Sequence, residues 1–270
     1  MRVLAIETTG ANASVALVEK GGDVRMEITT ERMNHLQFLM PMIEKLMKDC
    51  KMQIGDVDAI AVSEGPGSFT GVRIGVSSAR GLCQWLGKPC LPVPTLDSFR
   101  YNEGMGEGKL ALVLFDARRN QVYAEALTVK DGKSVALVPG GAYMFGEFMG
   151  LVKEALLNNI ENFPGAFSQV LCYGDGAAKF TIAISEEIET VLSNCDIRFP
   201  GDSSGYQRAD AIGKYALDMI EAAGGTEGFT DYTSVVPNYM RRAEAEQKLA
   251  PEKAAEYDRA QDTIKNAVEF

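Results

Sequence analysis

Short apolar runs, each bounded by a small polar turn, give the first half of the chain a regular order of elements. The runs have the length and the branched apolar content of strands, and Gly21 and Gly22 form the expected turn between two of them. Apolar residues three and four positions apart indicate two helices instead. In order, the pattern predicts strands over 2–7, 14–19 and 24–30, a helix over 34–50, a strand over 58–63 and a helix over 71–86.

The second half repeats this order. Its first strand ends in Asp116, as the first strand of the chain ends in Glu7, and Asp131-Gly132 takes the place of the glycine pair. The predicted elements are strands over 110–116 and 121–129, a third strand after the turn, a helix over 146–158, a strand over 169–173 and a helix over 209–223. Internal repetition on this scale predicts an α/β protein of two tandem ribonuclease-H/actin-like (ASKHA) lobes, each a mixed sheet flanked by helices.

The boundary between the lobes is expected within residues 101–108, because this stretch contains three glycines. This places a first lobe at 1–102 and a second lobe at 103–226. Residues 227–270 form a tail with a charged segment of helical composition and a polar end, and no separate domain is expected there.

Composition narrows the class of partner and the compartment. The formal net charge is −10, whereas a protein that binds nucleic acid alone needs a concentrated basic surface. No apolar run approaches the roughly 20 residues that cross a bilayer, and Glu7 comes too early for a secretory signal. The five cysteines include no CxxC pair, so we expect free thiols, no metal site and a cytoplasmic protein.

The two strand-end acids are candidates for a nucleotide site. In two-lobed proteins of this class the cleft lies between the lobes, and open α/β sheets bind ligands where their strands end. Glu7 and Asp116 are placed to hold a nucleotide with Mg²⁺, since this ion is bound through one or two carboxylates together with phosphates. The alternative is that each acid only caps a turn.

The glycine-rich segment 64–75 lies between a predicted strand and a predicted helix. Its glycines permit tight or left-handed turns, and the free N–H groups at a helix start favour anions. No Lys-Ser/Thr pair follows, so the segment is not a P-loop; it is either a phosphate-binding turn or a tight structural corner. The possible nucleotide or phosphate contacts are therefore Glu7, Thr8, Thr9, Gly65, Gly67, Ser68 and Asp116.

The helix over 34–50 has an apolar arc that covers more than half of its circumference. One stripe is predicted to face the core, and Phe38 and Met42 extend the arc to one side. This is wider than a surface helix needs, and an exposed apolar flank with a polar rim is typical of a protein interface. The predicted core stripe comprises Leu36, Leu39, Met40, Ile43, Leu46, Met47 and Cys50.

The helix over 71–86 carries small residues at steps of three and four, which let another helix approach closely. Arg73 and Arg80 lie seven residues apart on one shared face. Packing against the other helix of the same lobe explains the small residues equally well.

His35 is the only histidine, so histidine-pair metal sites are excluded by count, and no GxSxG motif supports a hydrolase.

Taken together, these segments resemble the bacterial TsaB (YeaZ) family over residues 1 to about 248. The 64–75 segment is the most specific match, and Glu7 departs from the family pattern, in which aspartate is common at this position. The matching segments are Leu4 to Thr9 with Ser14 to Leu17, Asn34-His35 with Leu39 to Ile43, Glu64 to Gly75 with Ala79 to Leu82, Asp116 to Arg118 with Val122-Tyr123, Gly174 to Ala177, and Pro237 to Arg241 with Glu244 to Glu246.

The resemblance implies a non-catalytic relative of TsaD, the subunit that transfers a threonylcarbamoyl group to the adenosine beside the anticodon in tRNA. TsaD carries a histidine-pair metal motif that one histidine cannot supply, so the chemistry is expected in TsaD and not in this chain. The family's older description as a glycoprotease is therefore not expected to hold. ATP or ADP with Mg²⁺ is expected only at the joint with TsaD, and tRNA is reached only through the complex.

The resemblance also implies how the chain assembles. TsaB-type proteins bind TsaD through the helices of the first lobe, TsaE joins the pair, and the same surface forms a homodimer when TsaD is absent. In this sequence those helices are 34–50 and 71–86. The expected interface residues are His35, Phe38, Leu39, Met42, Val72, Arg73, Val76, Ala79 and Arg80.

Three other functional classes are also compatible with the residues. A two-lobed kinase or phosphotransferase would bind Mg-ATP tightly and need both strand-end acids. A peptidase has little support from the residue count. An RNA-binding module would need a basic face, and its candidates are Arg73, Arg80, Arg118, Arg119, Arg241 and Arg242.

Overall fold

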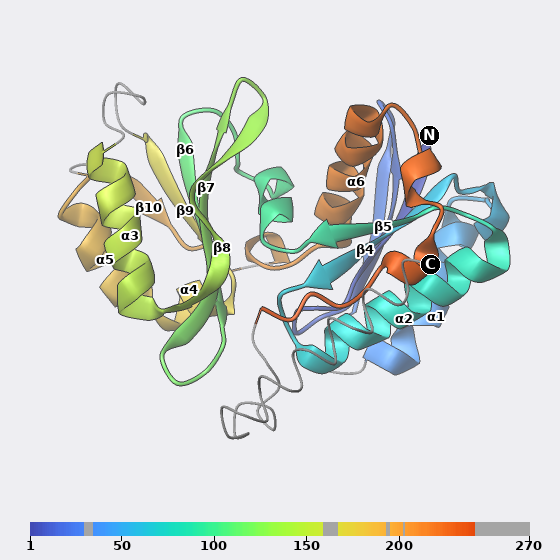
Figure 1. The fold of residues 1–270 in the computed structure, drawn as a ribbon, viewed down its shortest axis with the longest axis horizontal. Coiled ribbons are helices and arrows are strands. Elements are labelled where there is room, and N and C mark those ends of the chain that lie inside the picture. The colour runs from blue at the N-terminus through green and yellow to red at the C-terminus, as the bar shows by residue number, and fades with distance from the viewer. Residues whose placement is uncertain (30–34, 159–166, 193–194, 202, 241–270) are drawn as a thin grey trace. The chain divides into compact units, whose positions relative to one another are not determined.

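Figure 1 shows the computed structural model, which describes residues 1–29, 35–158, 167–192, 195–201 and 203–240. The chain divides into two compact units, Met1–Asn238 and Tyr239–Phe270, and every helix and strand described below lies in the first. The predicted helical segment after Pro237, together with Arg241 and Arg242, lies outside the described residues, as does Asn34.

The first sheet has five strands in the order β3-β2-β1-β4-β5. β1 pairs with β2, and β2 with β3, in antiparallel register, whereas β4 and β5 run parallel to β1. Buried residues run almost without a break along the central strands, as expected where helices cover both faces of a sheet. The strands are β1 (Arg2–Glu7), β2 (Ser14–Glu19), β3 (Val24–Ile28), β4 (Ala59–Gly65) and β5 (Cys90–Pro94).

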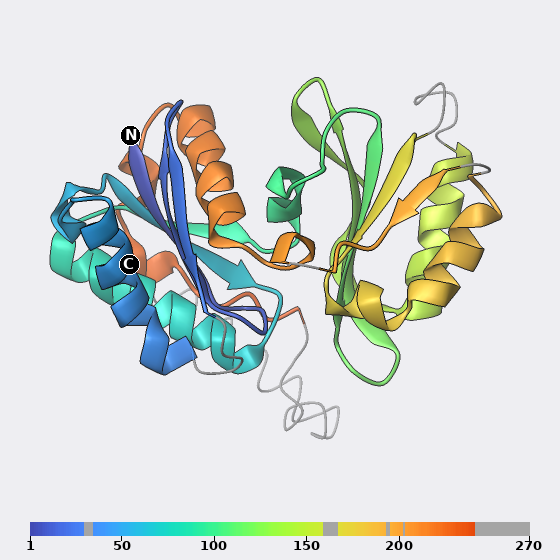
Figure 2. The same cartoon turned by 180° about the vertical axis from the view of Figure 1, so that it is seen from behind.

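Three helices sandwich this sheet (Figures 1 and 2). α1 (His35–Asp49) and α2 (Phe69–Leu86) cover one face, where their buried side chains join Leu4, Ile6 and Val15 in one core. α6 (Ala209–Ala223) covers the other face. α2 ends at Gly87, whose φ of 63° is the left-handed conformation predicted for the residue after this helix.

The second sheet repeats the first, with the order β10-β9-β6-β7-β8. β6, β7 and β8 are antiparallel, and β9 and β10 run parallel to β6. This repeated order is that of two ribonuclease-H/actin-like lobes and confirms the predicted fold class. The strands are β6 (Lys109–Asp116), β7 (Gln121–Lys130), β8 (Lys133–Met144), β9 (Gln169–Tyr173) and β10 (Asp196–Arg198).

One face of the second sheet packs against α3 (Phe145–Asn158) and α5 (Thr181–Glu189), with Leu110, Phe148 and Ile184 among the buried residues. The short α4 (Asp175–Lys179) begins directly after β9. Short 3-10 helical turns lie between the other elements: η1 (Ile54–Asp56), η2 (Asp97–Tyr101), η3 (Ser203–Gly205), η4 (Glu227–Phe229) and η5 (Tyr232–Ser234).

The position of α6 corrects the predicted domain division. The sequence pattern placed this helix in the second lobe, but Ile212 and Ala216 pack against Val3 and Ala5 of the first sheet. Gly213 permits this close approach, because a Cβ there would lie 2.4 Å from a methyl group of Val18. The first lobe is therefore built from two separate parts of the chain.

The chain passes between the lobes twice, and the two passages are joined by one side chain. Nδ2 of Asn102 donates hydrogen bonds to the backbone oxygens of Ser204, at 2.9 Å, and Tyr206, at 3.1 Å. Asn102 is buried, so losing these bonds would leave a polar group unpaired. The two passages are thus held side by side.

Candidate functional site

The carboxyl end of β1 is a corner in which two backbone segments touch. The backbone N–H of Ser68 donates to the carbonyl of Thr9 over 2.8 Å, and Oγ1 of Thr8 donates to the carbonyl of Gly71 over 2.7 Å. A Cβ at Gly71 would lie 2.0 Å from the carbonyl oxygen of Thr8. Glycine is required there because the start of α2 rests on the 8–9 turn.

Glu7, at the end of β1, is buried within this corner and holds the turn. Its Oε1 accepts hydrogen bonds from the backbone N–H of Thr9 and, over 2.6 Å, from Oγ1 of the same residue. Burial raises the pKa of Glu7, and the bonds from Thr9 offset part of that rise. The arrangement supports the reading of this acid as a structural cap.

Asp116 occupies the matching strand end in the second sheet, but its surroundings differ. Its Oδ1 accepts hydrogen bonds over 2.9 Å from Nζ of Lys179 and from the backbone N–H of Arg118. Its own N–H donates to Oδ1 of Asp175 over 3.0 Å. The ammonium group of Lys179 therefore already neutralises the half-exposed carboxylate of Asp116.

The candidate nucleotide contacts therefore fall into two separate places. Glu7, Thr8, Thr9 and the 65–68 loop share the first corner, whereas Asp116 lies in the second sheet with other partners. The hydroxyl groups of the two threonines are buried and bonded to the protein. In this arrangement the corner does not fit a phosphate group, so we derive no step through a nucleotide here. A nucleotide at a joint with another subunit stays a prediction.

Most of the predicted interface residues are core residues of the first lobe. The expectation of an exposed apolar flank is wrong for Met42, Val72 and Val76, and the predicted interface residues Leu39 and Ala79 are buried too; all are at most 9% exposed. Phe38 is half-buried against this core, and Arg73 and Arg80 lie toward the outside of α2. His35 begins α1, and its side chain lies outside the described residues.

Other apolar side chains point outward from the same two helices. Leu36 and Trp85 are 75% and 71% exposed, and Met40 and Phe69 are 43% and 42% exposed. The guanidinium of Arg73 lies 3.9 Å from the centre of the Phe69 ring. Leu36 and Met40 were predicted to face the core; the buried stripe instead centres on Leu39 and Leu46, and this turns Met40 outward and Met42 inward.

We use the name α1–α2 face for the exposed large apolar side chains of these two helices, Leu36, Met40, Phe69 and Trp85. Ser77 and Gly81 are exposed on α2 between Phe69 and Trp85, and a Cβ at Gly81 would meet nothing within 4 Å. Small residues between large apolar ones leave room for an approaching helix. The part of the small-residue stripe that contains Gly71 and Gly75 serves internal packing on Thr8 instead.

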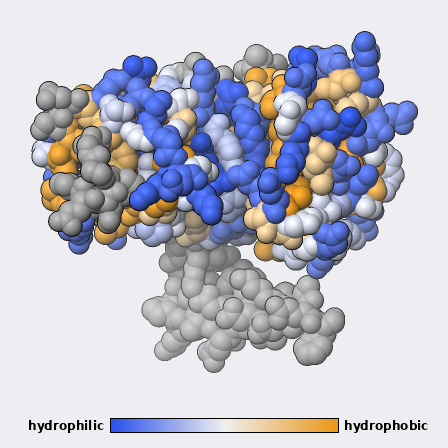
Figure 3. Space-filling view, turned by 90° about the horizontal axis from the view of Figure 1, so that it is seen from above, coloured by the Kyte–Doolittle hydropathy of each residue, from blue (hydrophilic) through white to orange (hydrophobic). Residues whose placement is uncertain are grey.

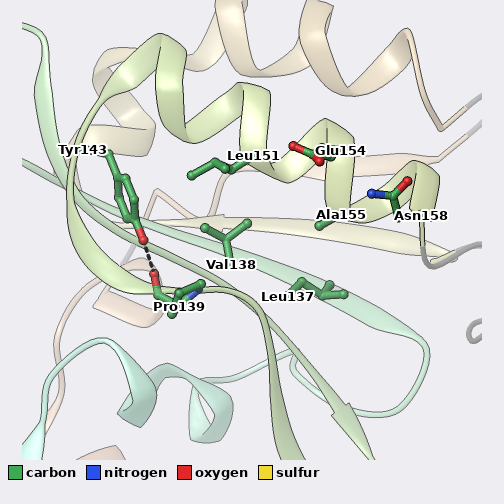
Figure 4. Close-up of a pocket in the computed structure, with 8 residues that line it drawn as sticks. All are labelled: Leu137, Val138, Pro139, Tyr143, Leu151, Glu154, Ala155 and Asn158. Carbon is green, nitrogen blue, oxygen red and sulfur yellow. Dashed lines mark hydrogen bonds between the residues drawn. The ribbon is translucent and has the colours of Figure 1, made fainter.

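A pocket between β8 and α3 was not indicated by the sequence, because its two walls are brought together only by folding (Figure 4). Its volume is about 440 Å³, and Tyr143 Oη donates to the carbonyl of Pro139 over 2.7 Å. Glu154 and Asn158 give one end a polar character. The lining residues are Leu137, Val138, Pro139, Tyr143, Leu151, Glu154, Ala155 and Asn158. They include no nucleophile or base arranged for catalysis.

One face of the molecule is mixed in character. On the face seen in Figure 3, hydrophilic side chains separate the apolar ones among the described residues. Within the described ranges, no three His, Cys, Asp or Glu side chains gather as a metal-binding group would require. None of the described helices combines the length and the apolar character needed to span a membrane.

Comparison with known proteins covers most of the chain. Residues 24–249 match the family model of TsaD, tRNA N6-adenosine threonylcarbamoyltransferase. The tRNA threonylcarbamoyladenosine biosynthesis protein TsaB of Bacillus subtilis is 31% identical over 248 residues, which are 92% of this chain and 97% of the relative. TsaB of Escherichia coli is 36% identical over 124 residues, 46% of this chain and 53% of the relative.

Solved structures share the fold. YeaZ from Pseudomonas aeruginosa has a TM-score of 0.64 at 23% identity, and the match covers 88% of this chain and 99% of that one. A second structure from the same organism, described as similar to peptidase YEAZ, matches with the same TM-score and identity. Sequence identity over nearly the full length of one relative and the match to the family model show that the chain belongs to the TsaB (YeaZ) family, which is related to TsaD.

Proposed function

We propose that this chain is a non-catalytic partner subunit for the threonylcarbamoyl modification of the adenosine next to the anticodon in tRNA. It would act in the cytoplasm by binding TsaD, with TsaE joining the pair, and reach tRNA only through that complex. Membership of the TsaB family places the chain in threonylcarbamoyladenosine biosynthesis. The observation that carries the partner role is the exposed apolar character of the α1–α2 face.

The exposed large apolar side chains of the α1–α2 face favour association. Trp85 and Leu36 expose most of their surface, and aromatic residues dominate the binding energy of many interfaces. A stable interface buries about 1,600 Å² in total, which two neighbouring helices can supply only in part, so loops beside them are expected to contribute. The same face would form the homodimer when TsaD is absent.

Docking acts on TsaD by selecting a conformation. A partner shifts an equilibrium only when it binds one state better than the other. We expect this chain to stabilise the active arrangement of TsaD and to supply no group to the reaction. ATP or ADP with Mg²⁺ would lie at the joint with TsaD and not within this chain. The reason is that Thr8 and Thr9 already form hydrogen bonds with Gly71 and Ser68.

The test compares equally exposed apolar residues on different faces. Trp85→Glu and Leu36→Glu are expected to weaken binding of purified TsaD about thirtyfold or more, the loss typical of a central interface residue. Isothermal calorimetry measures the binding, and thermal unfolding checks that each variant folds. Ile182, on α5 and also 75% exposed, supplies the matched control Ile182→Glu.

The outcome separates the alternatives. If both α1–α2 variants bind TsaD like the wild type, the assigned face is wrong. Val76→Asp is unsuitable here because Val76 is 2% exposed, so a buried charge would unfold the lobe.

The two-lobed kinase alternative predicts tight binding and turnover of Mg-ATP by the isolated chain, and calorimetry with Mg-ATP tests it.

A further inference from the structure

The second lobe carries a pocket that the proposed function does not use. It lies between β8 and α3 and has a volume of about 440 Å³ (Figure 4). Sites for small molecules are typically hollows of about 300–1,000 Å³ with mostly apolar walls and a few polar groups. This pocket, which we call the β8–α3 pocket, has the volume and the wall composition of such a site.

An irregular stretch of β8 forms one wall. The pairing with β7 skips Leu137, because its neighbours Ala136 and Val138 pair with consecutive residues of β7. Such a bulge bends a strand and changes the direction of its side chains. Leu137 and Val138 therefore both pack against the core that α3 covers, whereas adjacent residues of a regular strand point to opposite faces.

The ring of Tyr143 lies at one end of the pocket and is held in place by several contacts (Figure 4). Its Oη donates to the carbonyl of Pro139 over 2.7 Å, and its ring centre lies 5.7 Å from that of Phe148. A Cβ at Gly141 would lie 2.8 Å from Cζ of Tyr143, so glycine leaves room for the ring to fold back along the strand. The pocket is thus shaped before a ligand enters, which lowers the entropic cost of binding.

α3 supplies the opposite wall. Leu151, Ala155 and Asn158 follow one another at steps of four and three residues, so they lie on one face of the helix. Leu151 is 36% exposed and adds apolar surface, whereas the amide of Asn158 and the carboxylate of Glu154 are polar (Figure 4). The pocket therefore combines apolar walls with one charged group, the Glu154 carboxylate.

The charge of Glu154 is not balanced nearby. Among the residues that the structure describes, Glu154 forms no ion pair. Lys153, the only basic residue of α3, donates instead to Glu187 of α5 over 2.8 Å. The whole chain has a formal net charge of −10, so a cation near the pocket is attracted and an anion is repelled.

The backbone beside the pocket favours a small molecule over an added peptide strand. β8 is the outer strand of its sheet, and peptides can pair with such an edge through a regular row of backbone donors and acceptors. Here the row is interrupted, because Pro139 has no N–H and its carbonyl already accepts the bond from Tyr143. Recognition therefore depends on the side chains of the two walls.

We propose that the β8–α3 pocket binds a small amphipathic cation, with its apolar part between β8 and α3 and its protonated amine beside the carboxylate of Glu154. Burial of apolar surface drives binding, and the charge selects amines over neutral or acidic molecules. The ring of Tyr143 suits an aromatic group. The pocket is built from the second lobe alone, so the proposal is independent of binding to TsaD.

The first experiment compares three indole compounds that differ in charge. The full chain, labelled with ¹⁵N, is titrated with tryptamine, N-acetyltryptamine and indole-3-propionate while its amide resonances are followed by NMR. Tryptamine should shift the resonances of residues 137–143 and 151–158 with a Kd on the order of 1 mM, the affinity expected for a molecule of this size. The neutral compound should bind about threefold more weakly, and the acid more weakly still.

The second experiment changes the walls, with a matched control for each change. Glu154→Gln should weaken tryptamine about threefold and leave N-acetyltryptamine unchanged, whereas Glu186→Gln, an exposed change on α5, should alter neither. Leu151→Ala should weaken both compounds about fivefold, because apolar contact is lost. Leu157→Ala is its control, since Leu157 is 58% exposed on α3 and does not line the pocket.

Three results would overturn the proposal. One is the absence of shifts at these residues with 10 mM tryptamine, and another is equal affinity for the amine and the acid. The third is a shift of the same resonances when the protein concentration alone is raised, which would assign the pocket to an interface between two copies of the chain. All three use the wild-type chain, so they do not depend on the folding of a variant.

Discussion

The two lobes share one strand order, yet the same strand end has a different role in each. Glu7 is buried and accepts hydrogen bonds from Thr9 of the turn that follows it, whereas Asp116 is half-exposed and paired with Lys179. A repeated fold preserves positions in space and does not preserve the chemistry placed there. The pair of strand-end acids is thus better evidence for duplication than for a shared metal site.

The helices that begin near these strand ends differ as well. A Cβ at Gly71 would lie 2.0 Å from the carbonyl oxygen of Thr8, whereas a Cβ at Gly176 would lie 2.9 Å from that of Leu114. Both contacts are with backbone, which cannot move as a flexible side chain does. A side chain at Gly71 would therefore be accommodated less easily than one at Gly176.

The largest expected effect tests this difference directly. Gly71→Ala should cost about 3 kcal/mol or more, because overpacking against a fixed backbone forces the helix and the turn apart. Gly176→Ala should cost less, about 1–3 kcal/mol. Urea unfolding measures both. Gly81→Ala, with open space around it, is the control and should stabilise α2 by about 0.5–1 kcal/mol. Equal losses in the free energy of unfolding for Gly71→Ala and Gly176→Ala would contradict the proposed difference between these two positions.

A smaller effect tests the role of the buried acid. Thr9→Val removes the hydroxyl that donates to Glu7 but keeps the shape of the side chain. The free energy of unfolding should fall by about 1–3 kcal/mol, since a buried acceptor loses a partner. Thr9→Ser keeps the hydroxyl and should lose less. A Thr9→Val chain as stable as the wild type would mean that Glu7 does not hold the turn.

The smallest effect is expected at the other strand end. Lys179→Met removes the ion pair with Asp116, in which the two side chains are 40% and 28% exposed. Partly exposed pairs contribute about 0–1 kcal/mol, so unfolding should change little. A loss as large as that of Thr9→Val would show that Asp116 is as structural as Glu7.

The sequence predicted the repeat because alternation and turn residues are local signals. Acids at the ends of β1 and β6 and Gly87 after α2 appear where the pattern placed them. The glycine-rich segment left two readings open, and the bonds between Ser68 and Thr9 favour the structural corner.

The rest depended on contacts between distant parts of the chain. The apolar arc of α1 is wide enough to be rotated either way, so Met40 and Met42 were assigned to the wrong sides. α6 follows the second sheet in sequence but packs on the first.

Because α6 packs on the first sheet, the first lobe can be completed only late in the translation of the chain. When the ribosome has released only the residues up to β5, Val3, Ala5 and Ala16 have no helix to cover them. The second lobe must emerge in full before residues 209–223 can close that face. During translation the nascent chain therefore carries a bare apolar sheet for more than a hundred residues of synthesis, the interval in which a chaperone would be needed most.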